Sequence, residues 1–139
     1  MSLSAKLSIP MSERFSRKSR GSKEAHGLQF SYVTMNLLVS ILIPTHNAEN
    51  WIADTIRSAI TQTWVRKEII VVDDGSSDRT ADVARRFASK EVVVISKKNQ
   101  GAAAARNHAL QFCQGDYIQW LDADDILAPD KIERQLTAL

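Results

Sequence analysis

The rest of this chain is arranged around the segment Asp116-Tyr117-Ile118-Gln119-Trp120-Leu121-Asp122-Ala123-Asp124-Asp125. Its aromatic and aliphatic residues follow a glycine and are typical of a buried strand, and three carboxylates within four residues come at the end of that strand. Carboxylates so close together repel one another, so each of them tends to bind a proton unless a cation neutralises the group. The segment therefore predicts a strand that carries acidic side chains to one edge of a sheet.

These acidic residues have two interpretations. Oxygen ligands suit Mg²⁺ or Mn²⁺ better than zinc, and Mg²⁺ is usually held by one or two carboxylates together with substrate phosphates. Asp122 and Asp124 are therefore candidate ligands of a divalent metal ion. In the second interpretation the acids lie in a solvated turn between a strand and a helix, and Asp124 or Asp125 only caps that helix. The acidic pattern alone leaves both interpretations open.

Strand and helix patterns alternate along the chain before and after this segment. Apolar runs predict strands at residues 37–44, 68–72 and 92–95, and the nearly continuous aliphatic run at 37–44 is typical of a strand covered on both faces in a parallel sheet. Helical spacing predicts helices at residues 48–61, 102–113 and 129–139 and one that includes residues 83–87, with Trp51 and Leu139 on their apolar faces. The alternation predicts an α/β fold, with an open, mainly parallel sheet and helices on both of its faces.

Polar side chains follow three of the predicted strands. They are Thr45, His46 and Asn47 after the first strand, Asp73 and Asp74 after the second, and Asp122, Asp124 and Asp125 after the fourth. In open α/β sheets, ligands bind beyond the carboxyl ends of the strands. The three groups therefore predict one site at one edge of the sheet.

Length and charge restrict the function of the chain. Its 139 residues suit one domain, and its hydrophobic fraction of 44% is ordinary for a globular protein. The net charge of +2 comes from residues 1–36, which hold six basic and two acidic residues, whereas the remainder holds twelve basic and fourteen acidic residues. The folded part therefore has no electrostatic reason to bind nucleic acid. No apolar run approaches the roughly 20 residues that a membrane span needs, so none is predicted.

Residues 1–36 are rich in serine and basic residues and lack apolar periodicity, so we expect a disordered or artefactual N-terminal extension before a domain at residues 37–139. Two acidic residues, Glu13 and Glu24, and the lack of a compact apolar run argue against a secretory signal. The single cysteine, Cys113, forms no internal disulfide, which fits a reducing compartment. We expect a cytoplasmic protein or one that is peripheral at the inner face of the membrane.

Phosphate-binding glycine motifs are absent from the chain. No Gly-x-Gly-x-x-Gly follows the first strand and no Gly-Lys-Ser/Thr occurs, so a dinucleotide fold and a P-loop are disfavoured. Carboxylates would instead accept hydrogen bonds from a base and a ribose, while a metal ion at Asp122 and Asp124 bridged the phosphates. This arrangement suits a nucleoside diphosphate leaving group, because the metal ion stabilises the charge that develops on it.

Four ordered motifs resemble the N-terminal, donor-binding half of the family 2 glycosyltransferases with the GT-A fold. They are Val39–Asn47, Val71–Asp78, Asn99–Gly101 with Ala105–Asn107, and Gly115–Asp125. The resemblance covers about residues 37–139. It implies a nucleotide-sugar donor, commonly a UDP-sugar, a divalent Mn²⁺ or Mg²⁺ ion, an acceptor glycan or lipid-linked glycan, and inversion at the anomeric carbon.

The resemblance also implies roles for individual residues. The positions that match the donor site of the family are Pro44, Thr45, Asn47, Asp73, Asp74, Arg106, Asp122 and Ala123. Thr45 resembles the loop residue beside the nucleoside, and Asp74 resembles the acid that faces the base. Arg106 resembles the helix residue near the diphosphate or the metal-binding strand. Asp122 and Asp124 resemble the metal-binding pair of acids, with Asp124 as the more direct ligand.

Several of these residues have simpler interpretations. Asp73 could only brace the turn at Gly75, and Arg106 could be the structural partner of a buried acid. For His46 we expect packing or a loop hydrogen bond and not catalysis. The three tryptophans, Trp51, Trp64 and Trp120, are expected to pack in the core or between helices and not to serve as platforms for sugars.

No stretch of the chain resembles the second half of the family, which supplies the acceptor pocket and the carboxylate that deprotonates the acceptor hydroxyl. The catalytic base is therefore unknown. We expect a truncated donor-binding half of a glycosyltransferase that is inactive alone. Two alternatives are open: a non-catalytic module that binds nucleotide sugars, and an interaction domain whose acids are only surface charge.

Overall fold

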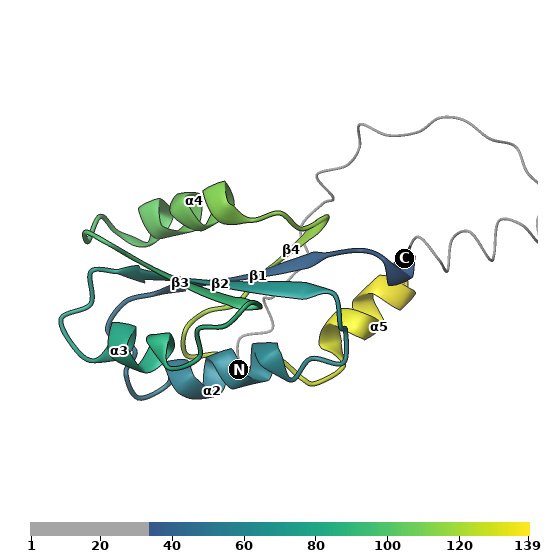
Figure 1. Ribbon diagram of the computed structural model, residues 1–139, viewed down its shortest axis with the longest axis horizontal. Helices are drawn as coiled ribbons and strands as arrows, with labels where there is room; N and C mark the ends of the chain where they lie inside the picture. The colour runs from purple at the N-terminus through teal and green to yellow at the C-terminus, as the bar shows by residue number, and fades with distance from the viewer. Residues whose placement is uncertain (1–33) are drawn as a thin grey trace, which may run out of the picture.

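The computed structural model describes residues 34–139, in which four parallel strands form one sheet (Figure 1). The strands are β1 (Val39–Thr45), β2 (Lys67–Asp74), β3 (Val92–Lys97) and β4 (Tyr117–Trp120). Their order across the sheet is β3-β2-β1-β4, and every neighbouring pair is parallel. The predicted α/β fold with an open parallel sheet is confirmed. Residues 1–33, which make up most of the expected N-terminal extension, lie outside the described residues.

Helices cover both faces of this sheet. They are α2 (Ile52–Ile60), α3 (Thr80–Arg85), α4 (Ala102–Phe112) and α5 (Lys131–Thr137). In Figure 1, α4 lies on one face of the sheet, and α2, α3 and α5 lie on the other. Within residues 34–139, every helix is too short or too polar to cross a bilayer.

The alternation of side chains along β1 and β2 produces the two halves of the core. Ile41, Ile43 and Val71 belong to the larger cluster, which packs against α2 and α5. Leu42 and Val72 belong to the smaller cluster, which packs against α4. Successive side chains of a strand point to opposite faces, so a strand that is covered on both faces is apolar almost throughout. This is why the aliphatic runs of the sequence predict the strands well.

Two residues that we expected in the core are exposed. Trp51 is 53% exposed and Leu139 is 60% exposed, so both predictions were wrong. The reason is the same at both positions: Trp51 precedes the first residue of α2, and Leu139 follows the last residue of α5. The other two tryptophans are placed as predicted. Trp64 is buried and donates its indole N–H to the Leu37 carbonyl at 3.0 Å, and Trp120 packs partly buried against the smaller cluster.

Gly115 lies where β4 approaches β1 at the amino edge of the sheet. Its N–H donates to Ser40 Oγ at 2.8 Å, and the neighbouring Asp116 Oδ2 accepts from the Leu38 N–H at 2.9 Å. A Cβ atom on Gly115 would lie 2.6 Å from the Ser40 nitrogen and 2.9 Å from the Leu38 oxygen. Only glycine therefore allows the two strands to come this close.

Candidate functional site

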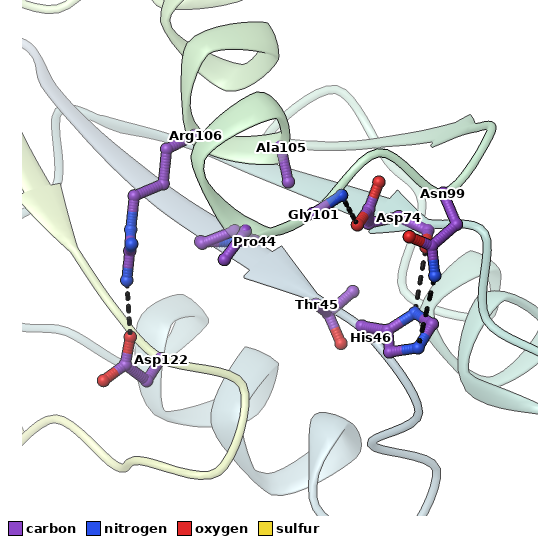
Figure 2. A pocket seen from close by; sticks show the side chains of 10 residues that line it. Pro44, Thr45, His46, Asp74, Asn99, Gly101, Ala105, Arg106 and Asp122 are labelled. Carbon is purple, nitrogen blue, oxygen red and sulfur yellow. Dashed lines mark hydrogen bonds and ion pairs between the residues drawn. The ribbon is translucent and has the colours of Figure 1, made fainter.

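A cavity of about 310 Å³ opens at the carboxyl ends of β1 and β2, beside the first turn of α4 (Figure 2). Its lining consists of Pro44, Thr45, His46, Asp74, Asn99, Gly101, Ala102, Ala105, Arg106 and Asp122. The structure thus brings together five of the predicted site residues, namely Pro44, Thr45, Asp74, Arg106 and Asp122. Three others, Asn47, Ala123 and Asp124, line a hollow next to this cavity. Asp73 lines neither.

Asp74 is the most strongly bonded acid in the cavity. Its Oδ1 accepts from Lys97 Nζ and from the Gln100 N–H, both at 3.0 Å, and its Oδ2 accepts from the Gly101 N–H at 2.9 Å. The side chains of Lys97 and Asp74 are only 11% and 4% exposed, and the two residues are partners in the register of β2 and β3. Asp74 therefore ties β3 and the start of α4, where N–H groups lack partners within the helix, to β2.

These contacts also determine the ionisation of Asp74. Burial by itself raises the pKa of this carboxyl. The hydrogen bonds from the Gln100 N–H, the Lys97 ammonium and the Gly101 N–H outweigh that effect and hold the pKa below its usual value. Asp74 is therefore a carboxylate at neutral pH, and within residues 34–139 its Oδ2 accepts one hydrogen bond.

We expect acid to destabilise the fold through Asp74. Because its pKa is lowered in the folded chain, the carboxylate stabilises the fold above the pKa of an unfolded aspartate, about 3.9, and this stabilisation is lost as the pH falls through the folded pKa. Urea unfolding from about pH 7 to about pH 2.5 should show a falling free energy of unfolding, with a smaller fall in Asp74→Asn. Asp82→Asn, which removes an exposed carboxylate, is the control. A pH dependence that is the same in wild type and Asp74→Asn would contradict the prediction.

His46 makes the loop hydrogen bond that we expected. Its Nδ1 lies 2.9 Å from the Asp74 carbonyl oxygen, so Nδ1 carries a proton and donates it there. Its Nε2 then accepts from the side-chain amides of Asn47 at 3.2 Å and Asn99 at 3.5 Å. The imidazole thus connects the loop after β1 with the ends of β2 and β3 (Figure 2).

Asn47 fastens the loop after β1 to the turn after β2. Its backbone is left-handed, with φ of 48°, a conformation that asparagine adopts more readily than most residues. Its N–H donates to Ser76 Oγ at 2.9 Å, and its Oδ1 accepts from the Ser77 N–H at 2.9 Å. The loop that we expect beside a nucleoside is therefore held in one position before any ligand binds.

Asp122, Asp124 and Asp125 form a cluster that we call the acidic triad. A carboxylate oxygen from each lies within 4.8 Å of the others. Asp122 and Asp124 are exposed and Asp125 is half-buried. The pKa of Asp125 is raised by burial and by the negative charges of Asp124 and Asp122. Three close carboxylates of this kind fit a hard divalent cation, which would relieve their repulsion.

The interpretation of these acids as helix caps is wrong. The next helix, α5, begins only at Lys131, and the residue before it, Asp130, makes no side-chain capping hydrogen bond. Residues 122–125 instead form a turn in which the Asp125 N–H donates to the Asp122 carbonyl at 3.0 Å. The turn gathers the acids on one loop without using them to start a helix.

Arg106 projects from α4 toward the acidic triad. Its Nη2 lies 3.8 Å from Asp122 Oδ1, and the two side chains are 50% and 56% exposed (Figure 2). Asp122 is not a buried acid, so the structural role that we considered for Arg106 is not what the structure shows. The guanidinium group stands at the open side of the cavity, where it can contact an anion.

Asp73 and Thr45 are partners in the register of β1 and β2. Asp73 Oδ1 and Thr45 Oγ1 are both buried and lack a hydrogen-bond partner among residues 34–139. Asp73 is two residues from Val71 along β2, so the two side chains point to the same face of the sheet, away from α4 and from the side chain of Asp74. No hydrogen bond joins its side chain to the turn at Gly75 within these residues, so the bracing role that we considered for it is not seen.

The fold and the site together define a class of enzyme. The crystal structure of S. aureus TarS residues 1–349 superposes with a TM-score of 0.68 and 26% identity over 73% of this chain and 32% of that one. TarS has the GT-A fold of glycosyltransferases, and this chain has the same fold. TarS has also been solved with UDP and with UDP-GlcNAc bound.

The sequence comparisons identify the family. Residues 40–139 match the model of glycosyl transferase family 2, and the chain belongs to that family. It is 42% identical over 102 residues to the putative teichuronic acid biosynthesis glycosyltransferase TuaG of Bacillus subtilis. It is 39% identical over 103 residues to the UDP-Glc:alpha-D-GlcNAc-diphosphoundecaprenol beta-1,3-glucosyltransferase WfgD of Escherichia coli. The matches cover 71% and 73% of this chain but only 40% and 41% of those two enzymes. The resemblance inferred from the four motifs is confirmed.

Proposed function

We propose that this chain binds a nucleotide sugar, with a UDP-sugar as the donor, and presents it for transfer to an acceptor hydroxyl with inversion at the anomeric carbon. The observation that carries the proposal is that one cavity contains a carboxylate, Asp74, at one end and the cationic Arg106 beside the acidic triad at the other. A nucleoside diphosphate needs hydrogen-bonding groups for its base at one end of a site and charged groups for its phosphates at the other end.

The nucleoside would lie at the inner end of the cavity. Asp74 Oδ2 accepts a single hydrogen bond from the part of the chain that the structure describes, so it can accept another from a base N–H. Thr45 lines the same cavity. His46 and Asn47 hold the surrounding loop in place.

The diphosphate would lie at the outer end. Asp122 and Asp124 would hold a divalent metal ion, Mn²⁺ or Mg²⁺, with Asp125 near enough to contribute. When bound, such an ion supplies positive charge to the oxygens of the leaving diphosphate. Arg106 adds a second positive charge at the same place and compensates the negative charge that grows as the glycosidic bond breaks.

The acceptor that we propose is a glycan or a lipid-linked glycan, with the enzyme at the cytoplasmic face of the membrane. The names of the two relatives support this choice, since one refers to teichuronic acid biosynthesis and the other to a sugar linked to diphosphoundecaprenol. In the proposed reaction, a hydroxyl oxygen of the acceptor displaces the nucleoside diphosphate from the opposite face of the sugar, and its proton passes to a general base.

Removal of one triad carboxylate tests the proposal. Calorimetric titration with UDP should show binding that requires Mn²⁺, with GDP and dTDP as the comparison nucleotides. Asp124→Asn should weaken Mn²⁺-dependent UDP binding by at least about tenfold, because it removes a charged ligand of the metal ion. The substitution also relieves repulsion within the acidic triad, so the fold should not suffer.

The matched control is Asp130→Asn, which removes an exposed acid that pairs with Arg134 on the surface. Its UDP affinity should equal that of the wild type. Equal UDP binding with and without Mn²⁺ would refute the metal site, and a lack of UDP binding under any condition would refute the donor site itself.

A further inference from the structure

Trp51 is a large apolar side chain that lies outside both core clusters. It is 53% exposed and occupies the position before α2, where it makes no side-chain capping hydrogen bond. Its main-chain carbonyl accepts from the Thr55 N–H and from Thr55 Oγ1, both at 3.2 Å. Any residue could provide that carbonyl, so these hydrogen bonds do not require an indole ring at this position.

The indole ring borders a hollow of about 340 Å³. The hollow is lined by Pro44, His46, Asn47, Ala48, Trp51, Ala123 and Asp124. Trp51 and Asp124 are held near each other because Thr55 Oγ1 also donates to the Ala123 carbonyl at 2.8 Å, which ties the acidic loop to α2. The lining thus combines one aromatic side chain with the polar side chains of Asn47 and Asp124.

This hollow adjoins the cavity that we assign to the nucleoside. Both are bordered by Pro44 and His46, but Asp122 lines the cavity and Asp124 lines the hollow. The acidic triad, whose carboxylate oxygens lie within 4.8 Å of one another, therefore stands between the two spaces. A ligand whose diphosphate is held at the triad has one end in the cavity and its other end in the hollow.

We propose that the hollow binds the transferred sugar of the donor and that Trp51 stacks against the face of its pyranose ring. This proposal rests on the proposed function, because it takes the diphosphate to lie at the acidic triad. The sugar is bonded directly to the diphosphate, so it must lie next to the triad on the side away from the nucleoside. A pyranose has an apolar C–H face, which suits the indole ring, and a rim of hydroxyl groups, which suits the side-chain amide of Asn47 and the carboxylate of Asp124. Trp51 is thus a residue for sugar binding, outside the set that binds the nucleotide.

The test compares the affinities of UDP and of UDP-sugars for the same chain. Calorimetric titrations in Mn²⁺ with UDP, UDP-glucose and UDP-GlcNAc are run on the wild type, Trp51→Ala and Trp51→Phe. Trp51→Ala should leave UDP affinity within about twofold of wild type and weaken the UDP-sugar that binds best by about three- to tenfold. Trp51→Phe, which keeps an aromatic face, should recover most of this loss.

Phe112→Ala is the matched control, because Phe112 is 46% exposed at the far end of α4 and lies outside both spaces. It should change neither affinity. Three results would overturn the assignment of Trp51: equal weakening of UDP and UDP-sugars, unchanged affinity for both, or no recovery in Trp51→Phe. In all three the wild type still binds UDP, so the proposed function stands; a wild type that binds neither ligand removes the proposed function and this inference together.

Discussion

Asp74→Ala is expected to lower the free energy of unfolding by about 3–5 kcal/mol, because it leaves the Lys97 ammonium buried without its counter-charge. The substitution also removes the acceptor of the Gln100 and Gly101 N–H groups at the start of α4. Urea unfolding monitored by circular dichroism measures the loss. Lys97→Met should be destabilising too, and the double variant should lose less than the sum of the single losses because the two side chains interact directly.

Asp54→Ala is the comparison for an ordinary ion pair. Asp54 bonds Arg57 on the surface of α2, with side chains that are 68% and 61% exposed, so its removal should change stability by no more than about 0.5 kcal/mol. A loss in Asp74→Ala that is as small as the loss in Asp54→Ala would show that the buried pair does not stabilise the fold. The expected loss also has a practical result: weak nucleotide binding by Asp74→Ala would not by itself prove contact with the base.

Gly115→Ala is expected to destabilise the chain by about 3 kcal/mol, at the upper end of the range for overpacking. The added Cβ would lie 2.6 Å from the Ser40 nitrogen and 2.9 Å from the Leu38 oxygen, and both atoms belong to the main chain. A main chain inside a sheet cannot move aside as a side chain can, so β4 would have to separate from β1. Thermal or urea unfolding measures the effect, and weaker Mn²⁺-dependent binding of UDP should accompany it, because β4 leads into the acidic triad.

A second substitution separates the main-chain clash from the side-chain clash. The same Cβ would also meet Ser40 Oγ at 2.5 Å, so Ser40→Ala in the Gly115→Ala background removes one of the three close contacts. Little stability should return, because the two main-chain contacts remain. Full recovery would mean that the hydroxyl alone opposes the methyl group, and near wild-type stability of Gly115→Ala would mean that β4 is free to shift.

The apolar patterns of the sequence predicted the sheet but not the ends of its strands. β2 continues through Asp74 and β3 continues through Lys97, whereas the aliphatic runs end earlier. A strand ends where its ladder of hydrogen bonds ends, and polar residues can take part in that ladder as well as apolar ones. The pairing of Asp74 with Lys97 depends on the register of β2 and β3, and nothing local in the sequence specifies register.

The part of the candidate site that could be predicted from the sequence consists of residues at the ends of strands. Asp74 and Asp122 were expected at the carboxyl edge, whereas Arg106 was implied only by the family resemblance; the structure places all three around one cavity. Lys97, which pairs with Asp74, was not predicted near the site, and Trp51 was predicted to pack in the core or between helices. Trp51 has the spacing of an apolar helix face, but the helix starts one residue later, so its side chain is not directed into the core. Helix starts are set by hydrogen bonding and loop geometry, which periodicity does not report.

The buried Lys97–Asp74 pair has a consequence for how this enzyme can diversify. Asp74 connects β2, β3 and the start of α4, so its replacement would destabilise the fold. Selection for a stable fold would therefore retain Asp74, whichever nucleotide the protein binds. The side chain of Trp51 makes no comparable hydrogen bonds among the described residues, so its replacement should cost the fold little stability. On the proposed assignment, variation among descendants of this sequence should accumulate around the hollow beside Trp51, and a laboratory library aimed at new donors should randomise Trp51 while Asp74 stays constant.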